Sequence, residues 1–465
     1  MISAIALDLG STSIKAGLLD QYGILSGIVA MPAPTIHADG GHYESDAQLY
    51  ALTAEQVLST CLSKSDLAQA GGFPPLGLCS QRSSFLIWEQ ATGKPLTPLI
   101  SWQDNRGAES CVALKSHETL ITELTGLRLT PYFFAAKLRV VLHENPHWRE
   151  RLERGELLVG TLDTFLIWRW TGGKHHLTDG SMAARTLLMD IRQQQWSPVL
   201  CDLFGIPLGI LPTIKPSTGL NLRLGNGLTL QASLADQSAA LIASVGEDRE
   251  VALVNLGTGG FVIRYMGEDQ RGTNGYLRTL VFKDNTLRAH IAIEGTLNSI
   301  AAALAPYPVT DCNADDMAAE DIFCIAEPSG LGAPYFRNDL GLQFSRPVDH
   351  LTRSQIACLL LEAIIFRVVR ILEDFHRGAA IKRVYLSGGL SELTGLQQGI
   401  AQCLHCEVFR LQQRDASLQG AAILAAGIKH VGHTDAERIL IAGNNKALPE
   451  KYLRWKHWFD SLLDA

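Results

Sequence analysis

The sequence lacks the features that mark a membrane-spanning, nucleic-acid-binding or disulfide-stabilised protein. Its richest apolar stretch, residues 356–366, is interrupted by Glu362 and falls short of the roughly 20 residues that span a bilayer. Forty basic residues stand against 47 acidic ones, a net charge of −7, so there is no excess positive charge to hold nucleic acid or an anionic membrane. The nine scattered cysteines are an odd number, which favours reduced thiols over a disulfide framework. We therefore expect a cytoplasmic protein with a small ligand and with neither a nucleic-acid nor a membrane partner.

Proline and glycine are also too few, at 18 and 42 of 465 residues, for a collagenous or low-complexity chain. At roughly 100–200 residues per domain, the length predicts two to four domains. Apolar patterns typical of strands alternate with patterns typical of helices, which indicates α/β layers.

One sequence plan occurs twice in the chain. A four-residue apolar run, then Asp or Asn, Leu, Gly and small hydroxylated residues, spans residues 4–12 and again 251–259, an offset of 247 residues. A second apolar stretch follows each copy, so each predicts a strand, a tight turn and a return strand. Two domains of one type account for this most simply, with a boundary in the charged segment 244–250. We expect domains at 1–245 and 246–465.

The two repeated turns have the composition of a phosphate-binding site. Glycine and small hydroxylated residues let backbone N–H groups approach phosphate oxygens, and a strand-end carboxylate such as Asp8 can hold Mg²⁺ through water. Ordinary hairpin turns use the same residue types, so the repetition, with a further glycine pair after a third predicted strand, is what favours phosphate binding. The residues expected to contact phosphate groups are Ser11, Thr12, Ser13, Lys15, Gly257, Thr258, Gly388 and Gly389.

Neither copy is a P-loop, which requires Gly-x-x-x-x-Gly-Lys-Ser/Thr, and no Gly-x-Gly-x-x-Gly follows the first strand. P-loop nucleotide hydrolases and Rossmann dehydrogenases are therefore disfavoured.

Further motifs follow in order between residue 4 and about residue 427: Gln81 and Arg82, then 101–106, 125–133, 160–164, 178–186, 235–240 and 330–336. Together with the turns they resemble the FGGY carbohydrate kinases, and the N-terminal half is most similar to glycerol kinase. The resemblance implies an α/β protein with the actin-like ATPase fold, in which two ribonuclease-H-like domains face each other across a nucleotide cleft. It also implies ATP and Mg²⁺ as cofactors, a sugar-binding N-terminal domain with the catalytic base, and a nucleotide-binding C-terminal domain.

The resemblance makes Asp236 the candidate catalytic base, a carboxylate that accepts the proton of a sugar hydroxyl as the bond to the γ-phosphoryl group forms. An Asp before an apolar helix can also be its N-cap, and the two roles are compatible. Arginine offers a planar fork of donors to hydroxyl groups, and aromatic faces cover carbohydrate C–H surface, although Trp102 and Phe261 also suit core packing. Asp104 and Arg106 either touch the substrate or support the residues that do. The residues matching the family's substrate positions are Gln81, Arg82, Trp102, Tyr132, Asp236, Gln237 and Phe261.

Two departures from the family pattern bear on specificity. Ser83 follows Arg82 where glycerol kinases carry an acidic residue, which favours a longer polyol or a ketose. Leu393 stands where an Asn often lies beside the adenine. The residues that contact adenine and ribose, and the selectivity for ATP over other nucleotides, are therefore left open.

We expect ATP-dependent phosphorylation of a ketose or polyol, with that carbohydrate and ATP as partners. The alternatives are glycerol kinase proper, a catalytically weak sugar-binding or regulatory protein, and an actin-like chaperone or filament ATPase. Self-association into a homo-oligomer is left open.

Overall fold

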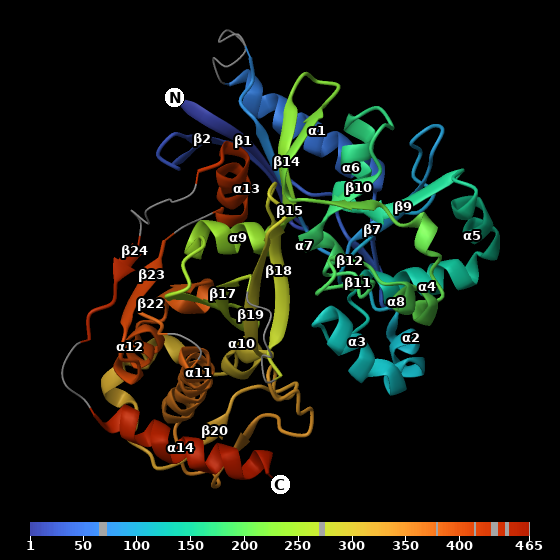
Figure 1. The fold of residues 1–465 in the computed structure, drawn as a ribbon. Helices are drawn as coiled ribbons and strands as arrows, with labels where there is room; N and C mark the ends of the chain where they lie inside the picture. The colour runs from blue at the N-terminus through green and yellow to red at the C-terminus, as the bar shows by residue number, and fades with distance from the viewer. Residues whose placement is uncertain are drawn as a thin grey trace. The chain divides into compact units, whose positions relative to one another are not determined.

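The computed structural model describes residues 1–64, 72–268, 275–377, 380–412, 415–428, 436–441 and 446–464 (Figure 1). The chain divides into two compact units. Unit 1 comprises Met1–Gly246, Thr279–Ile291 and Asp415–Val431, and unit 2 comprises Glu247–Arg278, Ala292–Arg414 and Gly432–Ala465. The chain first passes from unit 1 to unit 2 after Gly246, one residue from the expected boundary at 245/246. The segments that begin at Thr279 and Asp415 return to unit 1.

The main sheet of unit 1 has the strand order β14-β15-β6-β1-β2-β3. Its strands are β1 (Ile2–Leu9), β2 (Ser13–Asp20), β3 (Leu25–Pro32), β6 (Leu76–Ser80), β14 (Thr218–Arg223) and β15 (Thr229–Ala235). Strand β1 pairs antiparallel with β2 and parallel with β6, and β6 pairs parallel with β15. Residues Ala4, Ile5, Ala6 and Leu7 of β1 have no exposed surface, because the central strand of such a sheet is covered on both faces.

Closely packed helices cover this sheet. They are α1 (Ala47–Ser63), α9 (Asp236–Val245) and α13 (Ala416–Ala426). Helix α13 lies beside α9, as Figure 1 shows for the red and green helices. A Cβ atom at Gly420 would lie 1.8 Å from the Ala239 carbonyl oxygen, and one at Gly77 would lie 2.1 Å from the Ala421 carbonyl oxygen. Only glycine therefore permits α13 to approach α9 and β6 this closely.

A second part of unit 1 is built on a five-stranded sheet of order β4-β5-β8-β7-β9. Its strands are β4 (His37–Asp39), β5 (His42–Ser45), β7 (Phe85–Glu89), β8 (Leu99–Ile100) and β9 (Leu157–Thr161). The helices of this part are α2 (Ala108–Ala113), α3 (Glu118–Thr125), α4 (Phe134–Glu144), α5 (Pro146–Glu153), α6 (Leu162–Trp170), α7 (Gly180–Ala183) and α8 (Pro198–Phe204). Short pairs β10 (Leu177–Asp179) with β13 (Thr213–Lys215) and β11 (Met189–Asp190) with β12 (Gln195–Trp196) complete it.

The second large sheet has the order β18-β19-β17-β16-β22-β23-β24. Its strands are β16 (Val251–Leu256), β17 (Gly260–Gly267), β18 (Leu277–Lys283), β19 (Ala289–Leu297), β22 (Arg383–Ser387), β23 (Glu407–Leu411) and β24 (Ala436–Arg438). Residues 279–291, which include most of β18 and the start of β19, are counted with unit 1. Unit 2 contains α10 (Ile300–Leu304), α11 (Arg353–His376), α12 (Thr394–Cys403), α14 (Ala447–Leu463) and the pair β20 (Cys324–Ile325) and β21 (Gln343–Phe344). Helix α11 begins at a capping box of Thr352 and Gln355 and is buried along most of its length.

The two copies of the repeated sequence plan hold equivalent places in the two sheets. Strands β1 and β16 are internal, each pairs antiparallel with the strand that follows it, and each pairs parallel with a later strand on its other side. This arrangement confirms the expected pair of ribonuclease-H-like α/β domains.

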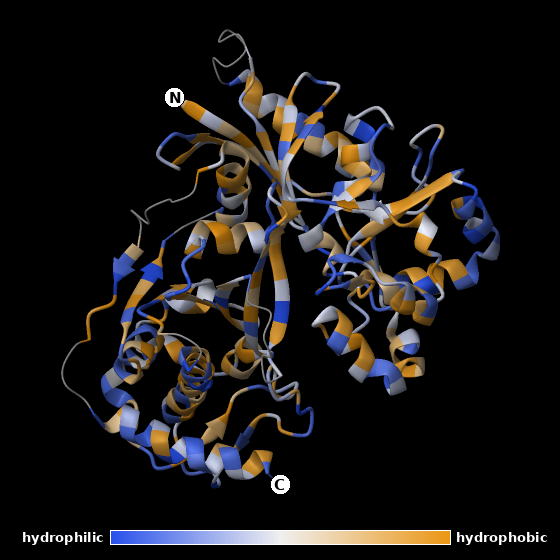
Figure 2. Cartoon of the chain, in the orientation of Figure 1, coloured by the Kyte–Doolittle hydropathy of each residue, from blue (hydrophilic) through white to orange (hydrophobic). Residues whose placement is uncertain are grey.

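Hydropathy follows this organisation. Figure 2 shows apolar residues along β1 and a mostly hydrophilic α5. Helix α14 is amphipathic, and its Trp455 and Phe459 are fully buried in the core of unit 2. Within the described ranges, no helix combines the length and apolarity needed to cross a bilayer. All nine cysteines lie in these ranges and are free thiols.

The packing of α13 predicts that Gly420→Ala destabilises unit 1. The added methyl group must displace the backbone of α9, so we expect the free energy of unfolding to fall by about 2 kcal/mol or more. Gly209→Ala is the control, since nothing lies within 4 Å of its Cβ position. Denaturant unfolding of both variants checks this, and equal stability of the two would contradict the packing described here.

Candidate active site

The carboxyl ends of three neighbouring parallel strands lie level in unit 1. Leu9 of β1 is the register partner of Ser80 in β6, and Ser80 is the partner of Ala235 in β15. Each of these residues ends its strand. Side chains at or just beyond these positions therefore share one edge of the sheet, which is where ligands bind in open parallel sheets.

Asp236 and Arg82 meet at this edge. The Arg82 Nε atom lies 3.8 Å from Asp236 Oδ1, and each side chain keeps a quarter of its surface exposed. The N-cap of α9 is Ala235, and Asp236 is the first helical residue, so its carboxylate is not the cap. The carboxylate instead accepts the backbone N–H of Gln237 at 2.7 Å. The side chain of Asp236 is thus held in place and still reachable by a ligand.

Burial raises the pKa of Asp236 above its ordinary value, and the nearby Arg82 and the Gln237 amide act in the opposite direction. A carboxylate in such surroundings is a better proton acceptor than one in water, because desolvation disfavours its charged form. Asp236 therefore combines a fixed, reachable carboxylate with a raised pKa, which makes it a candidate general base.

Asp8 is a half-buried residue, and one oxygen of its carboxylate lacks a hydrogen-bond partner in the part of the chain that the structure describes. Its Oδ1 atom is buried and has no hydrogen-bond partner among the described residues. Burial and the negative charge of Asp236 raise the pKa of Asp8 to about 7, while Cys79 and Lys15 act in the opposite direction. Two carboxylates at one edge of a sheet repel each other, so a cation bound there would relieve both the repulsion and the unpaired oxygen.

Mg²⁺ fits these residues. The described part of the chain holds no cluster of three His, Cys, Asp or Glu side chains able to bind a metal. Mg²⁺ does not require one, because it keeps several water ligands and is held by one or two carboxylates together with phosphate oxygens. Asp8 would provide the carboxylate, as the sequence predicts.

A hydrogen bond from Tyr50 holds the turn between β1 and β2. The Tyr50 hydroxyl donates to the Gly10 carbonyl oxygen at 2.7 Å, and Gln81 Nε2 donates to the Tyr50 hydroxyl at 3.4 Å. A Cβ atom at Gly10 would lie 2.7 Å from the Ser13 carbonyl oxygen, so the turn requires glycine. Thr12 is exposed at its tip. The turn therefore presents small residues outward on a fixed base, which suits phosphate binding.

Two predicted contact residues also have structural partners. Gln81 is buried and accepts a hydrogen bond from the Ser84 hydroxyl at 2.9 Å, so it joins the turn to the segment after β6. The Lys15 ammonium lies 2.6 Å from a carboxylate oxygen of Asp415, the residue before α13. Contacts of Gln81 with the sugar and of Lys15 with ATP remain predictions.

Two aromatic side chains that the sequence assigns to the substrate lie together in unit 1. Trp102 and Tyr132 are 38% and 49% exposed, and their ring centres are 6.5 Å apart at an interplanar angle of 56°. Exposed aromatic faces of this kind suit the C–H surface of a carbohydrate. Trp102 is therefore not a core residue. Phe261 belongs to β17 and is 39% exposed.

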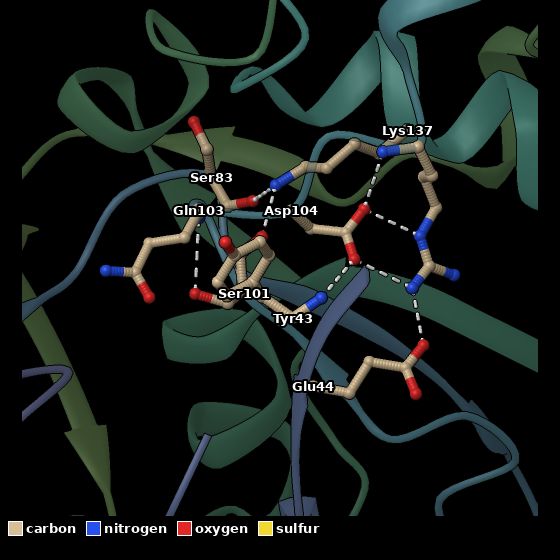
Figure 3. A network of polar contacts seen from close by, with 8 residues as sticks. Tyr43, Glu44, Ser83, Ser101, Gln103, Asp104 and Lys137 are labelled. Carbon is tan, nitrogen blue, oxygen red and sulfur yellow. Dashed lines mark hydrogen bonds and ion pairs between the residues drawn. The ribbon is translucent and has the colours of Figure 1, made fainter. Parts of the chain in front are cut away.

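Asp104 and Arg106 support the Trp102 segment (Figure 3). Asp104 is fully buried and accepts hydrogen bonds from the Tyr43 amide at 2.7 Å and from Arg106 Nε at 2.8 Å. Burial alone would raise the pKa of Asp104, but the hydrogen bonds from Arg106 and Tyr43 hold it below its ordinary value. Arg106 also pairs with Glu44. Of the two roles that the sequence leaves open, the structure favours support.

In unit 2, two glycine-containing turns follow neighbouring strands. Strands β16 and β22 are parallel, so Gly257 and Thr258 lie at the same end of the sheet as Gly388 and Gly389. Gly388 has φ 86°, and a Cβ atom there would lie 2.4 Å from the Leu256 carbonyl oxygen, so the position requires glycine. The predicted phosphate-binding residues of unit 2 are thus brought together.

Sequence reasoning missed several residues that hold these side chains. They are Tyr50, Asp415 and Lys137, whose ammonium group donates to the Ser83 and Ser101 carbonyl oxygens. All three are far in sequence from the groups they contact, and nothing in the local sequence marks Tyr50 or Asp415 as important. Lys137 could have been noticed, because it interrupts an apolar helical stretch at residues 134–138.

Comparisons with known proteins agree with this geometry. The model for the N-terminal domain of the FGGY family of carbohydrate kinases matches residues 3–254, and the model for its C-terminal domain matches residues 252–427. A glycerol kinase of Alkalilimnicola ehrlichii is 32% identical over 447 aligned residues, covering 92% of this chain and 90% of that protein. The apulose kinase of Pectobacterium atrosepticum is 32% identical over 486 aligned residues, covering 97% and 96%. The crystal structure of Plasmodium falciparum glycerol kinase with ADP has a similar fold, with a TM-score of 0.85 at 22% identity over 98% of each chain.

The unpaired Oδ1 atom and the raised pKa of Asp8 predict that Asp8→Asn stabilises the free protein and weakens its response to Mg²⁺ and nucleotide. Without ligand, removing the buried charge should raise the free energy of unfolding by about 1 kcal/mol. With Mg²⁺ and ADP, the variant should gain less stability than the wild type, because ligand binding stabilises only in proportion to its affinity. Thermal melting with and without Mg²⁺ and ADP checks both halves. A variant that melts lower without ligand and responds normally to it would rule out the role given to Asp8.

Proposed function

Because the chain belongs to the FGGY family of carbohydrate kinases, we propose that it transfers the γ-phosphoryl group of ATP to a hydroxyl group of a ketose or polyol. The family makes it an ATP-dependent carbohydrate kinase that uses ATP with Mg²⁺. The substrate and the roles of individual residues are the part that we propose.

The observation that carries the proposed mechanism is the held and partly exposed carboxylate of Asp236. A sugar hydroxyl is a poor nucleophile, and a carboxylate within hydrogen-bond reach accepts its proton as the hydroxyl oxygen attacks phosphorus. Asp236 is held by Gln237, keeps exposed surface and has a raised pKa. Arg82, next to it, donates hydrogen bonds to the other hydroxyl groups of the sugar. Its positive charge also balances part of the negative charge of Asp236 before the sugar hydroxyl transfers its proton.

The remaining residues bind and orient. The turn at Gly10 and Thr12 offers backbone N–H groups to phosphate oxygens, on the base that Tyr50 provides. Trp102 and Tyr132 cover the apolar surface of the sugar. Bound near Asp8, Mg²⁺ would neutralise charge that develops on the phosphates.

The position after Arg82 supports a substrate other than glycerol. Ser83 is buried, and its hydroxyl donates to the Arg185 carbonyl oxygen at 2.7 Å. This position therefore offers no carboxylate to a ligand hydroxyl, so the site has one fewer strong acceptor with which to select a small triol. Both a glycerol kinase and an apulose kinase are relatives at 32% identity, which keeps glycerol as the alternative substrate within the kinase class.

A panel of acceptors tests the proposed substrate class. We expect ADP release to depend on sugar, with a ketose or a polyol longer than glycerol giving a kcat/KM about tenfold or more above that of glycerol. The measurement is coupled ADP release with glycerol, tetritols, pentuloses and deoxy-sugars. Glycerol as the best acceptor would make the protein a glycerol kinase proper. No sugar-dependent ADP release with any acceptor would favour a sugar-binding or regulatory protein.

Replacement of the base gives a second prediction. Asp236→Asn should fold and bind ATP normally but lose about 10²–10⁴-fold in kcat, because the amide cannot accept the hydroxyl proton. Asp46→Asn is the matched control. Asp46 is likewise an aspartate at the start of a helix, as the N-cap of α1, and it lies outside the proposed chemistry. Steady-state kinetics and nucleotide binding check the pair. Near-normal turnover of Asp236→Asn would remove Asp236 from the mechanism.

A further inference from the structure

Lys137 is a buried lysine whose ammonium group binds two backbone carbonyls. It is the fourth residue of α4, and its side chain has no exposed surface. Its Nζ atom donates to the Ser83 carbonyl oxygen at 2.9 Å and to the Ser101 carbonyl oxygen at 2.7 Å, as Figure 3 shows. It also lies 5.8 Å from the centre of the Phe85 ring, a favourable cation–π distance. Among the described residues, the ammonium thus has two carbonyl oxygens and one aromatic ring as partners, and no carboxylate.

The two carbonyls belong to the segments that carry expected substrate residues. Ser83 directly follows Arg82, and Ser101 directly precedes Trp102. Lys137 itself lies five residues after Tyr132, in the first turn of α4, which begins two residues after Tyr132. One side chain therefore connects its own helix to two segments that lie 54 and 36 residues away in sequence.

The backbone at Ser83 needs such a connection. Its φ of 62° is in the left-handed region, which costs a residue with a Cβ roughly 1 kcal/mol or more. Such a conformation persists only where the surroundings hold it. The Ser83 hydroxyl is bound to the Arg185 carbonyl, and the Ser83 carbonyl is bound to Lys137. Next to it, the Ser84 hydroxyl accepts the Trp102 amide at 3.0 Å, so the two segments also contact each other.

Burying a lysine at this position has a cost. Burial lowers the pKa of Lys137 to about 7, with the Asp104 charge opposing and the Arg106 charge reinforcing that shift. A methionine of similar length would avoid this desolvation cost but would leave the Ser83 and Ser101 carbonyl oxygens without the donor that Lys137 provides. Only a side chain with donors can bind both carbonyls at once.

We propose that Lys137 is a positioning residue, which fixes Arg82 and Trp102 relative to each other through the carbonyls of Ser83 and Ser101. This inference rests on the proposed function, because it assigns those two residues to the sugar. The proposal predicts an effect on sugar binding and little effect on nucleotide binding. Loss of Lys137 displaces the sugar-binding side chains, whereas the glycine turn at Gly10 has its own anchor in Tyr50.

Lys137→Met tests the proposal. We expect the KM for the best sugar to rise about tenfold or more, because small displacements of binding groups are costly, while the KM for ATP changes less than about twofold. Lys137→Gln retains one amide donor and should restore part of the sugar KM. It also serves as the test variant if Lys137→Met does not fold.

Val141→Ala is the control for a purely structural role. Val141 is buried one turn further along α4 and offers no side-chain donor. It should lower the melting temperature but leave both KM values near those of the wild type. Lys137→Met with an unchanged sugar KM, or with sugar and ATP KM values raised equally, would overturn the proposal.

Hydrogen–deuterium exchange separates this inference from the proposed function. Amides in peptides covering 81–84 and 100–104 should exchange faster in Lys137→Met than in the wild type or in Val141→Ala, whether or not any sugar is phosphorylated. Wild-type protein that is inactive on every sugar would refute the proposed function and leave this readout intact. Unchanged exchange in both peptides would refute the positioning role even in an active kinase.

Discussion

The parallel register of β1, β6 and β15 is the constraint on which the candidate site depends. Strand ends that lie level and about 4.8 Å apart bring together side chains from the beginning, the first third and the middle of the chain. Asp8 and Asp236 are placed at this edge although their charges repel, and both have raised pKa values. The fold therefore holds two carboxylates in an unfavourable state that a cation and a ligand hydroxyl would relieve, as in other sites where stability is given up for function.

Several contacts in the rest of unit 1 hold the residues at this edge. Glycines at 77 and 420 let α13 approach the sheet and α9, which begins with Asp236. Tyr50 anchors the glycine turn, and Lys137 holds the segments that follow β6 and β8. Buried hydrogen bonds to backbone carbonyls are well suited to this, because an unmade bond there costs more than a made one gains.

The sequence predicted what depends on local pattern. The repeated strand and glycine turn and the two α/β domains follow from short motifs and their order. Lys137 and Tyr50 could not be predicted with their partners, because their contacts join distant segments and depend on how α4 and α1 pack. For the same reason, no local signal showed that residues 279–291 and 415–428 pack with unit 1. Leu280 and Ile291 join a buried cluster with Met189, and α13 packs against α9.

The central claim is that phosphoryl transfer takes place at the carboxyl edge of this sheet with Asp236 as the base. A crystal structure with a non-hydrolysable ATP analogue, Mg²⁺ and the best sugar tests it most directly. The claim predicts a sugar hydroxyl within about 2.6–3.2 Å of an Asp236 carboxylate oxygen, on the side that faces the γ-phosphoryl group. A sugar bound with its reacting hydroxyl against a different side chain, and Asp236 out of reach, would contradict it.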